Sequence, residues 1–259
     1  MLYALFYLSF LYLPVLFLPL FSFNDSAFIA FPLSGFTTKW YTQMWADTAM
    51  QRALLNSIEV AAFAAVISTA LGLMAAKALT RNHLRGGGVI LGFVNLPLFI
   101  PDIVLGISLL IVLNLAGLPL SLLSVIVGHV LICIPFAMAV LMSRLTGFDH
   151  SLEDASRDLG ENEWMTFWRV TFPLVLPGII ASLLLTFIVS FDDFLIAYFL
   201  AGTDATLPIF IWAQLRFPYQ LPKVLALGAL ILAASCVLVV FAEWVRGLGL
   251  RDRSPITGA

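Results

Sequence analysis

The chain has 259 residues, of which 61% are hydrophobic and only 11% are charged, and its formal net charge is −2. Its mean hydropathy of +1.03 is higher than a water-soluble domain of this length needs. The composition therefore excludes an ordinary soluble domain and predicts an integral membrane protein. We expect membrane lipid, and no nucleic acid, among its partners.

Six apolar runs are long enough for helices that cross the hydrocarbon core of a bilayer, which takes about 20 residues. They cover Leu2–Phe23, Leu54–Leu79, Gly88–Leu115, Ser121–Met142, Gly178–Leu200 and Val224–Trp244. The first run is too long for a signal peptide and has no basic segment before it. We therefore predict an all-α integral membrane protein with six transmembrane helices.

Two of these runs have a distinctive composition. The second is rich in Ala, Ser and Gly, which let helices approach closely, so we expect it to be buried in a bundle. The third contains Pro97, Pro101 and Gly106, which predict a kinked or broken helix. Broken backbone at membrane depth is tolerated only inside protein or beside a water-filled cavity.

The basic residues predict the orientation. With six spans, both termini lie on the same side, and the positive-inside rule places the side with more Lys and Arg in the cytoplasm. Four basic residues fall on one side, namely Lys39, Arg52, Arg216 and Lys223. Nine fall on the other, namely Lys77, Arg81, Arg85, Arg144, Arg157, Arg169, Arg246, Arg251 and Arg253. We therefore expect cytoplasmic N- and C-termini.

One long polar segment, from residue 144 to residue 177, separates the fourth and fifth runs. Ser151 followed three residues later by Asp154 is typical of a capping box at a helix start. Glu153 and Arg157 have the spacing of an i,i+4 ion pair. Gly160 stands where such a helix would end in the left-handed conformation.

This short helix is predicted to be amphipathic and to be followed by another. Its narrow apolar stripe consists of Leu152, Ala155 and Leu159. A second short helix is expected to begin near Asn162. Pro173 and Pro177 are expected to stop it before the fifth run.

The segment resembles a known motif. Its pattern, Glu153-x-Ala155-x4-Gly160-x9-Val170-x-Phe172-Pro173, is similar to the EAA loop of binding-protein-dependent ABC importer permeases. It departs from the family pattern at Asp154, Val170 and Phe172. In that family the loop forms a coupling helix that docks in a cleft of the ATPase subunit. The resemblance implies this role for Glu153, Asp154, Ala155, Arg157, Asp158 and Gly160, and the alternative is an ordinary cytoplasmic loop.

Four further segments resemble the polyamine (spermidine/putrescine) branch of these permeases. They are residues 55–61, 101–110, 143–149 and 190–194. The resemblance implies a MetI-like fold, with an N-terminal helix and extracytoplasmic loop at 1–53, the type-1 ABC transmembrane domain at 54–246 and a cytoplasmic tail at 247–259. It also implies three partners: an ABC ATPase dimer, a second permease subunit and an extracytoplasmic solute-binding protein.

The chain is not expected to be an enzyme. It has no Gly-x4-Gly-Lys-[Ser/Thr] loop for ATP. No metal-ligand spacing stands out, and both cysteines lie in apolar runs. We therefore expect no cofactor in this chain, and ATP and Mg on the partner ATPase.

Three carboxylates fall well inside predicted spans, away from the span ends, where such groups often mark transport pathways. Asp102 and Asp192 each lie fourteen residues beyond the start of a run, or about 21 Å from the inner edge of a straight helix. Acid at one depth in two spans suits a cationic solute, so we predict a substrate pathway that includes Asp102, Asp192 and Asp193. The alternative is that these side chains cap broken helices or bond each other, and it is stronger for Asp193.

Two other residues have competing interpretations. Trp212 is suited to stacking on a solute in the pathway, or equally to anchoring at the membrane interface. His129 is better explained as a packed, hydrogen-bonded side chain than as a proton relay. The functional prediction is an importer permease for a polyamine. Its alternatives are a permease for another small organic solute and a secondary transporter driven by an ion gradient.

Overall fold

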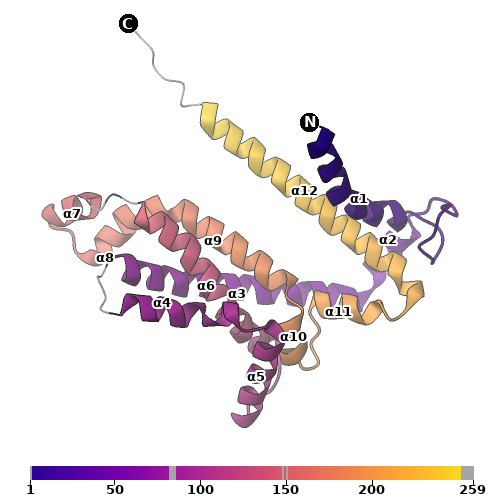
Figure 1. The fold of residues 1–259 in the computed structure, drawn as a ribbon, viewed down its shortest axis with the longest axis horizontal. Coiled ribbons are helices and arrows are strands. Elements are labelled where there is room, and N and C mark those ends of the chain that lie inside the picture. The colour runs from indigo at the N-terminus through magenta and orange to yellow at the C-terminus, as the bar shows by residue number, and fades with distance from the viewer. Residues whose placement is uncertain (1, 82–85, 148, 150, 252–259) are drawn as a thin grey trace, which may run out of the picture. The chain divides into compact units, whose positions relative to one another are not determined.

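A computed structural model describes residues 2–81, 86–147, 149 and 151–251, and its regular structure is almost entirely helical (Figure 1). Within these ranges there is no strand, only an isolated bridge between Asn24 and Phe36. The α-helices are α1 (Leu2–Ser22), α2 (Lys39–Ala46), α3 (Thr48–Arg81), α4 (Gly87–Asn95), α5 (Asp102–Leu115), α6 (Leu122–Thr146), α7 (Ser151–Asp158), α8 (Glu163–Thr166), α9 (Phe172–Asp192), α10 (Leu195–Leu200), α11 (Leu207–Gln214) and α12 (Leu221–Arg251). Shorter turns are η1 (Leu96–Phe99), η2 (Phe167–Thr171) and η3 (Pro218–Gln220). The predicted basic residues Arg85 and Arg253 lie outside the described residues.

The helices confirm the predicted class. Five helical segments are long and apolar enough to cross a membrane, and a bent pair of helices brings the number to six among the described residues. The five are Leu5–Ser22, Thr48–Arg81, Leu122–Thr146, Glu163–Asp192 and Pro218–Val237, and the bent pair is Gly87–Phe99 with Asp102–Leu115. The protein is therefore an all-α membrane protein, as the apolar runs predict.

The chain forms two compact units, one of residues 52–210 and one that joins residues 1–51 to residues 211–259. In the second of these, α12 packs against α1 and α2. The Lys223 ammonium donates to the Asp47 carboxylate, and the Trp40 indole Nε1 donates to the Asn24 carbonyl at 2.7 Å. The predicted boundaries at residues 53 and 246 stay predictions.

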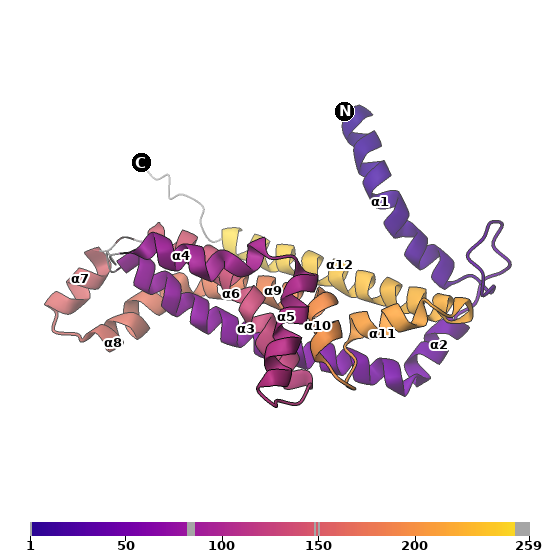
Figure 2. The same cartoon turned by 60° about the horizontal axis from the view of Figure 1, so that its bottom comes forward.

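In the unit of residues 52–210, α3, α6 and α9 run alongside one another (Figures 1 and 2). The small residues of α3 form its packed face, because Ala61, Ala64 and Ala76 are completely buried whereas larger neighbours such as Phe63 are exposed. Thr69 of α3 also shares a buried hydrogen bond of 3.0 Å with Ser182 of α9. The expectation that the second run is packed in a bundle is therefore confirmed for one face of the helix.

The third apolar run is broken, as its prolines predict. The arm of α4 and η1 meets α5 at a bend of 101°. Ile100 is extended (φ −90°, ψ 129°) because the ring of Pro101 disfavours the helical conformation in the residue before it. Gly106 does not take part in the break: it lies inside α5, where a Cβ atom would come within 2.7 Å of the Phe199 ring of α10.

The fifth run differs from its prediction at both ends. The helix is continuous from Glu163 to Asp192, so Pro173 does not stop it. The preceding turn, η2, is a π-helix. Its wider winding relieves the clash that a proline ring makes with the carbonyl one turn before it. The helix then ends at Asp192 rather than Leu200, and α10 is a separate helix after the break.

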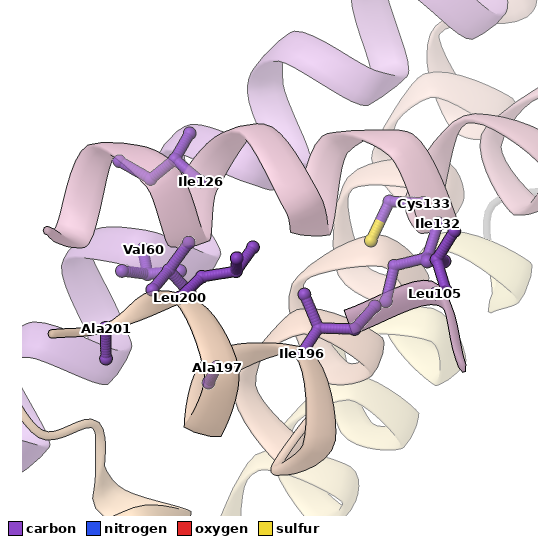
Figure 3. Packing of buried hydrophobic residues seen from close by; sticks show 10 residues of the cluster. Val60, Leu105, Ile126, Ile132, Cys133, Ile196, Ala197, Leu200 and Ala201 are labelled. Atoms are coloured by element: carbon purple, nitrogen blue, oxygen red, sulfur yellow. The ribbon is translucent and has the colours of Figure 1, made fainter. Parts of the chain in front are cut away.

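A buried apolar cluster holds this break in place. Figure 3 shows Leu105 of α5, Ile132 of α6 and Ile196 of α10 near one another. Leu200 of α10 belongs to the same cluster, and both α10 side chains are completely buried. The start of α10 therefore has a fixed position against α5 and α6. Asp192 and Asp193 immediately precede this anchored segment.

Candidate functional site

The short helix α7 begins where the polar segment predicts, but with a different cap. Asp149 Oδ1 accepts a hydrogen bond from the Ser151 N–H at 3.0 Å. The hydrogen bonds from the backbone and hydroxyl of Ser151 hold the pKa of the Asp149 carboxyl below its usual value. The side-chain acceptor at the helix start is therefore Asp149, in place of the predicted Ser151–Asp154 capping box.

The end of α7 confirms the prediction for Gly160. Its φ is +90°, a conformation that other residues adopt only with strain. The Gly160 N–H donates to the Arg157 carbonyl at 2.9 Å and the Glu161 N–H to the Ser156 carbonyl at 3.2 Å, which is the Schellman pattern. The next helix is capped by Asn162, whose Oδ1 accepts from the Met165 N–H at 2.8 Å.

Glu153 does not form the predicted pair with Arg157. Glu153 is only 6% exposed, and its Oε1 lies 2.9 Å from Arg81 Nη2 at the end of α3. The same oxygen accepts from the Thr171 hydroxyl. Arg157 contacts Asp154 at 3.3 Å instead. The predicted Glu153–Arg157 pair is wrong because the Glu153 carboxylate binds Arg81, which is 72 residues away in the sequence.

The two faces of α7 are the reverse of those of an ordinary surface helix. Its buried residues are polar, Glu153 and Ser156, and Ser156 shares a hydrogen bond of 3.1 Å with Thr166. Its apolar stripe faces outward: Leu152 is 46% exposed, and Leu159, the residue directly after α7, is 86% exposed. Asp154, Ala155 and Asp158 are exposed as well. The chain thus holds α7 by polar contacts and leaves its apolar side uncovered.

A cavity of about 610 Å³ lies beside this helix, between the ends of α3 and η2. Its lining is mostly polar and includes both signs of charge, from Lys77, Arg81 and Arg157 against Glu153, Asp154 and Glu163. The Lys77 ammonium lies 4.7 Å from the centre of the Phe167 ring, which is a cation–π geometry. The cavity therefore carries no net charge that would select an anion or a cation.

The second group of predicted residues lies at helix breaks. Asp193 Oδ2 accepts from the N–H groups of Ile196 and Ala197, each at 3.1 Å, so it caps α10. It also lies 3.1 Å from His129 Nε2, and His129 Nδ1 is 2.7 Å from the Ser190 hydroxyl. Asp193 and His129 therefore take the capping and packing arrangements that the sequence leaves open as alternatives.

Asp102 and Asp192 are both exposed. Asp102 is the first residue of α5, where the partial positive charge of a helix N-terminus favours a carboxylate. Asp192 is the last residue of α9. The helix that ends at Asp192 begins at Glu163 rather than at Gly178. The predicted distance of about 21 Å is counted from Gly178, so it no longer measures the distance from a helix start. The common depth of Asp102 and Asp192 stays a prediction.

Trp212 lies on α11 and is 49% exposed. Its predicted place in a substrate pathway stays a prediction, as do the pathway roles of Asp102, Asp192 and Asp193. The coupling role of the α7 residues also stays a prediction, although the local helix–glycine–helix geometry is as expected.

Several residues that organise this unit are not predicted from the sequence. Arg81 and Thr171, which bind Glu153, are distant from it in sequence and carry no local signal. Asn56 Nδ2 donates to the Ala205 carbonyl at 2.9 Å, and the Leu207 N–H donates to Ser57 Oγ at 2.8 Å. The polar Asn56–Ser57 pair at the start of an apolar run is the signal that points to this last contact.

Comparison with known proteins agrees with this architecture. The family described as "Binding-protein-dependent transport system inner membrane component" matches residues 68–247. The spermidine/putrescine transport system permease protein PotC of Escherichia coli (strain K12) is 33% identical over 238 residues, which are 92% of this chain and 89% of PotC. The putrescine transport system permease protein PotI of the same organism is 36% identical over 244 residues, which are 91% of this chain and 86% of PotI.

A solved structure has the same fold. A chain of a bacterial ABC transporter involved in the import of the acidic polysaccharide alginate superposes with a TM-score of 0.71, at 20% identity, over 95% of this chain and 93% of that one. The matched family covers more than half of the chain, and the helices that it covers include α6, α7 and α9. The chain therefore belongs to the family of binding-protein-dependent transport system inner membrane components, in which it is a permease subunit and not an enzyme.

Proposed function

We propose that this chain is a permease subunit of an ATP-driven importer, with α7 as the helix that binds the ATPase and a polyamine as the solute. It would act in the inner membrane with an ATPase dimer, a second permease subunit and an extracytoplasmic solute-binding protein. ATP and Mg would bind the ATPase. Both termini and α7 would lie in the cytoplasm, and transport would proceed by alternating access.

The observation that carries this proposal is the reversed amphipathicity of α7. An exposed apolar stripe next to charged residues is typical of a surface that another protein covers. Leu152 and Leu159 form that stripe, and the buried Glu153 holds the opposite face of the helix to the chain. A helix that is presented in this way can enter an apolar cleft without losing its own attachment.

The choice of a polyamine has two supports. The chain is similar over about nine tenths of its length to permeases that are named for spermidine and putrescine. Asp102 and Asp192 are exposed carboxylates at two helix breaks, and a carboxylate makes a charge-assisted hydrogen bond with an ammonium group. The fold does not decide the solute, because the structural neighbour is named for an acidic polysaccharide.

A charged substitution on the exposed stripe tests whether this surface contacts the ATPase. In the complex purified through a tag on this chain, Leu159→Asp should abolish co-purifying ATP hydrolysis and putrescine uptake. The same change at Leu118, an exposed leucine of the turn between α5 and α6, is the control and should retain both. Full ATP hydrolysis with Leu159→Asp would refute the docking role of α7.

The test of the solute is competition. Uptake of labelled putrescine into cells that produce the importer should be inhibited by spermidine and unaffected by molybdate or an acidic oligosaccharide. Uptake that depends on this chain but ignores both polyamines would leave the permease assignment intact and show that the solute is another one. A proton ionophore that abolishes uptake while ATP is maintained would instead favour the ion-driven alternative.

A further inference from the structure

The buried Glu153 carboxylate joins three separate elements at one point. It lies on α7, and one of its oxygens contacts both Arg81 Nη2 at 2.9 Å and the Thr171 hydroxyl. Arg81 is the last residue of α3, and Thr171 is the last residue of η2, directly before α9. The side chains of Arg81 and Glu153 are only 9% and 7% exposed. The pair is therefore shielded from the solvent screening that weakens surface ion pairs.

The attachment of α7 to these helices is polar and directional. Besides Glu153, the other buried residue of α7 is Ser156, which bonds Thr166 at 3.1 Å. The two residues are three positions apart and so lie on one face of the helix. The cavity of about 610 Å³ borders Arg81, Glu153 and Thr171. The ion pair, rather than close apolar packing, therefore spans this part of the gap between α3 and α7.

The two helices that receive these contacts are also tied to each other. Thr69 of α3 and Ser182 of α9 share a buried hydrogen bond of 3.0 Å, about three turns away from Arg81 and Thr171 respectively. At its far end, α9 stops at Asp192. The Glu153 carboxylate therefore contacts elements that lead into two apolar helices joined to each other by this hydrogen bond, one of which ends at an exposed acid.

We propose that Arg81 and Thr171 are positioning residues that hold the Glu153 carboxylate and transmit the displacement of α7 to α3 and α9. This inference rests on the proposed function, because it takes α7 to be the helix that the ATPase moves. It places the Glu153 carboxylate inside the permease and leaves the contact with the ATPase to the exposed stripe. The contacts of Glu153 with Arg81 and Thr171 are called the latch below.

The test separates the latch from the docking surface. Importer purified through a tag on this chain is reconstituted with its solute-binding protein, and ATP hydrolysis and putrescine uptake are measured in the same vesicles. Glu153→Gln keeps the shape of the side chain and removes its charge, and Thr171→Val removes the hydroxyl at nearly constant volume. Both should retain ATP hydrolysis, whereas putrescine carried per ATP should fall about tenfold with Glu153→Gln and less with Thr171→Val.

Two further variants guard against a merely structural effect. Arg81→Lys keeps the charge without the planar guanidinium and should recover part of the coupling that Arg81→Ala loses. Glu161→Gln is the matched control, since it breaks the exposed pair of Glu161 with Arg169 in the same loop and should change neither quantity.

The outcomes are distinguishable. Wild-type putrescine per ATP with both Glu153→Gln and Thr171→Val would overturn the latch, as would a loss of coupling that Arg81→Lys does not relieve. Loss of ATP hydrolysis in these variants, in parallel with loss of ATPase from the complex, would place Glu153 at the docking surface and also overturn the latch. If Leu159→Asp retains full hydrolysis, the proposed function fails first, whatever the latch variants do.

Discussion

The chain has two pairs of adjacent acidic residues, Glu153–Asp154 in α7 and Asp192–Asp193 at the end of α9, and the two pairs are alike in their exposure to solvent. In each pair one carboxylate is largely shielded from solvent and the other is exposed: Glu153 and Asp193 have side chains that are 7% and 10% exposed, whereas that of Asp154 is 68% exposed. Adjacent residues on a helix point in directions that differ by about 100°, which separates Glu153 from Asp154, whereas Asp193 follows the last residue of α9 with extended backbone (φ −68°, ψ 127°).

The carboxylates of Glu153 and Asp193 differ in what they bind. The Glu153 carboxylate accepts hydrogen bonds from side chains of two other elements, Arg81 of α3 and Thr171 of η2. Asp193 receives two backbone N–H groups of the helix that follows it, together with His129 of α6. The first carboxylate therefore joins elements that could move apart, while the second fixes a break in the chain. We expect the first to affect coupling and the second to affect stability.

The largest effect is expected from removing the capping carboxylate. Asp193→Ala leaves two N–H groups and the buried His129 without their acceptor, and should lower the free energy of unfolding by about 2–4 kcal/mol. The measurement is thermal unfolding of the purified protein in detergent.

Asp192→Ala is the matched control, because Asp192 is exposed and should change stability by less than about 0.5 kcal/mol. Equal destabilisation by the two variants would contradict the division of roles within this pair.

The exposed acids should affect transport rather than stability. Asp192→Asn and Asp102→Asn are expected to lower uptake of a labelled diamine about tenfold, or about 1.4 kcal/mol, because each removes a charge-assisted contact with the cation. Asp193→Asn should reduce uptake less when the amounts of protein in the membrane are matched. If all three variants transport at the wild-type rate, the carboxylates are structural and the solute assignment rests on similarity alone.

The sequence predicts this molecule well where a signal is local. The apolar runs, the broken third run, the left-handed Gly160 and the helix after Asn162 all depend on residues within a few positions of each other. The predicted Glu153–Arg157 pair fails because spacing shows which partners are near along the helix, and not that a buried arginine at the end of α3 competes for the same carboxylate.

The predicted limits of the fifth helix are wrong for a related reason. Prolines at 173 and 177 indicate a stop, but the π-turn that accommodates the first of them has no composition signal. Conversely, nothing apolar marks the true end at Asp192, since the run continues to Leu200. The break falls at the two adjacent acids, Asp192 and Asp193, and the common depth of Asp102 and Asp192 stays a prediction.

A neutral contact tests whether charge is needed to join helices. Ser57→Ala removes the acceptor of the Leu207 N–H, and both residues are buried, so we expect a loss of about 1–2 kcal/mol in the free energy of unfolding. Ser108→Ala is the control, because that exposed hydroxyl bonds the Val104 carbonyl of its own helix. A loss as large as that of Asp193→Ala would show that burial, and not charge, sets the size of the effect.

The smallest effect concerns a carboxylate outside the spans. Asp47 caps the start of α3 through bonds of 3.1 Å from the Ala49 and Met50 N–H groups, and pairs with Lys223. Burial raises the pKa of the Asp47 carboxyl, but the hydrogen bonds from Lys223 and Met50 outweigh it, so the pKa lies below its ordinary value of 3.8. A lowered pKa means that Asp47 stabilises the fold above pH 3.8 and that this contribution is lost as the pH falls below it.

Asp47→Asn keeps a capping oxygen and removes the charge, so the variant should be less stable than the wild type by about 0.5–1 kcal/mol at pH 7. The difference in unfolding midpoint between the two proteins should stay nearly constant down to about pH 5 and shrink as the pH is lowered below 3.8, because the carboxyl of the unfolded wild type and then that of the folded wild type become neutral. Asp25→Asn provides the contrast, since the Asp25–Lys39 pair is 53% and 41% exposed and should give a smaller difference at every pH. A difference for Asp47→Asn that does not change with pH would mean that the shape of the cap, and not the ion pair with Lys223, stabilises this end of α3.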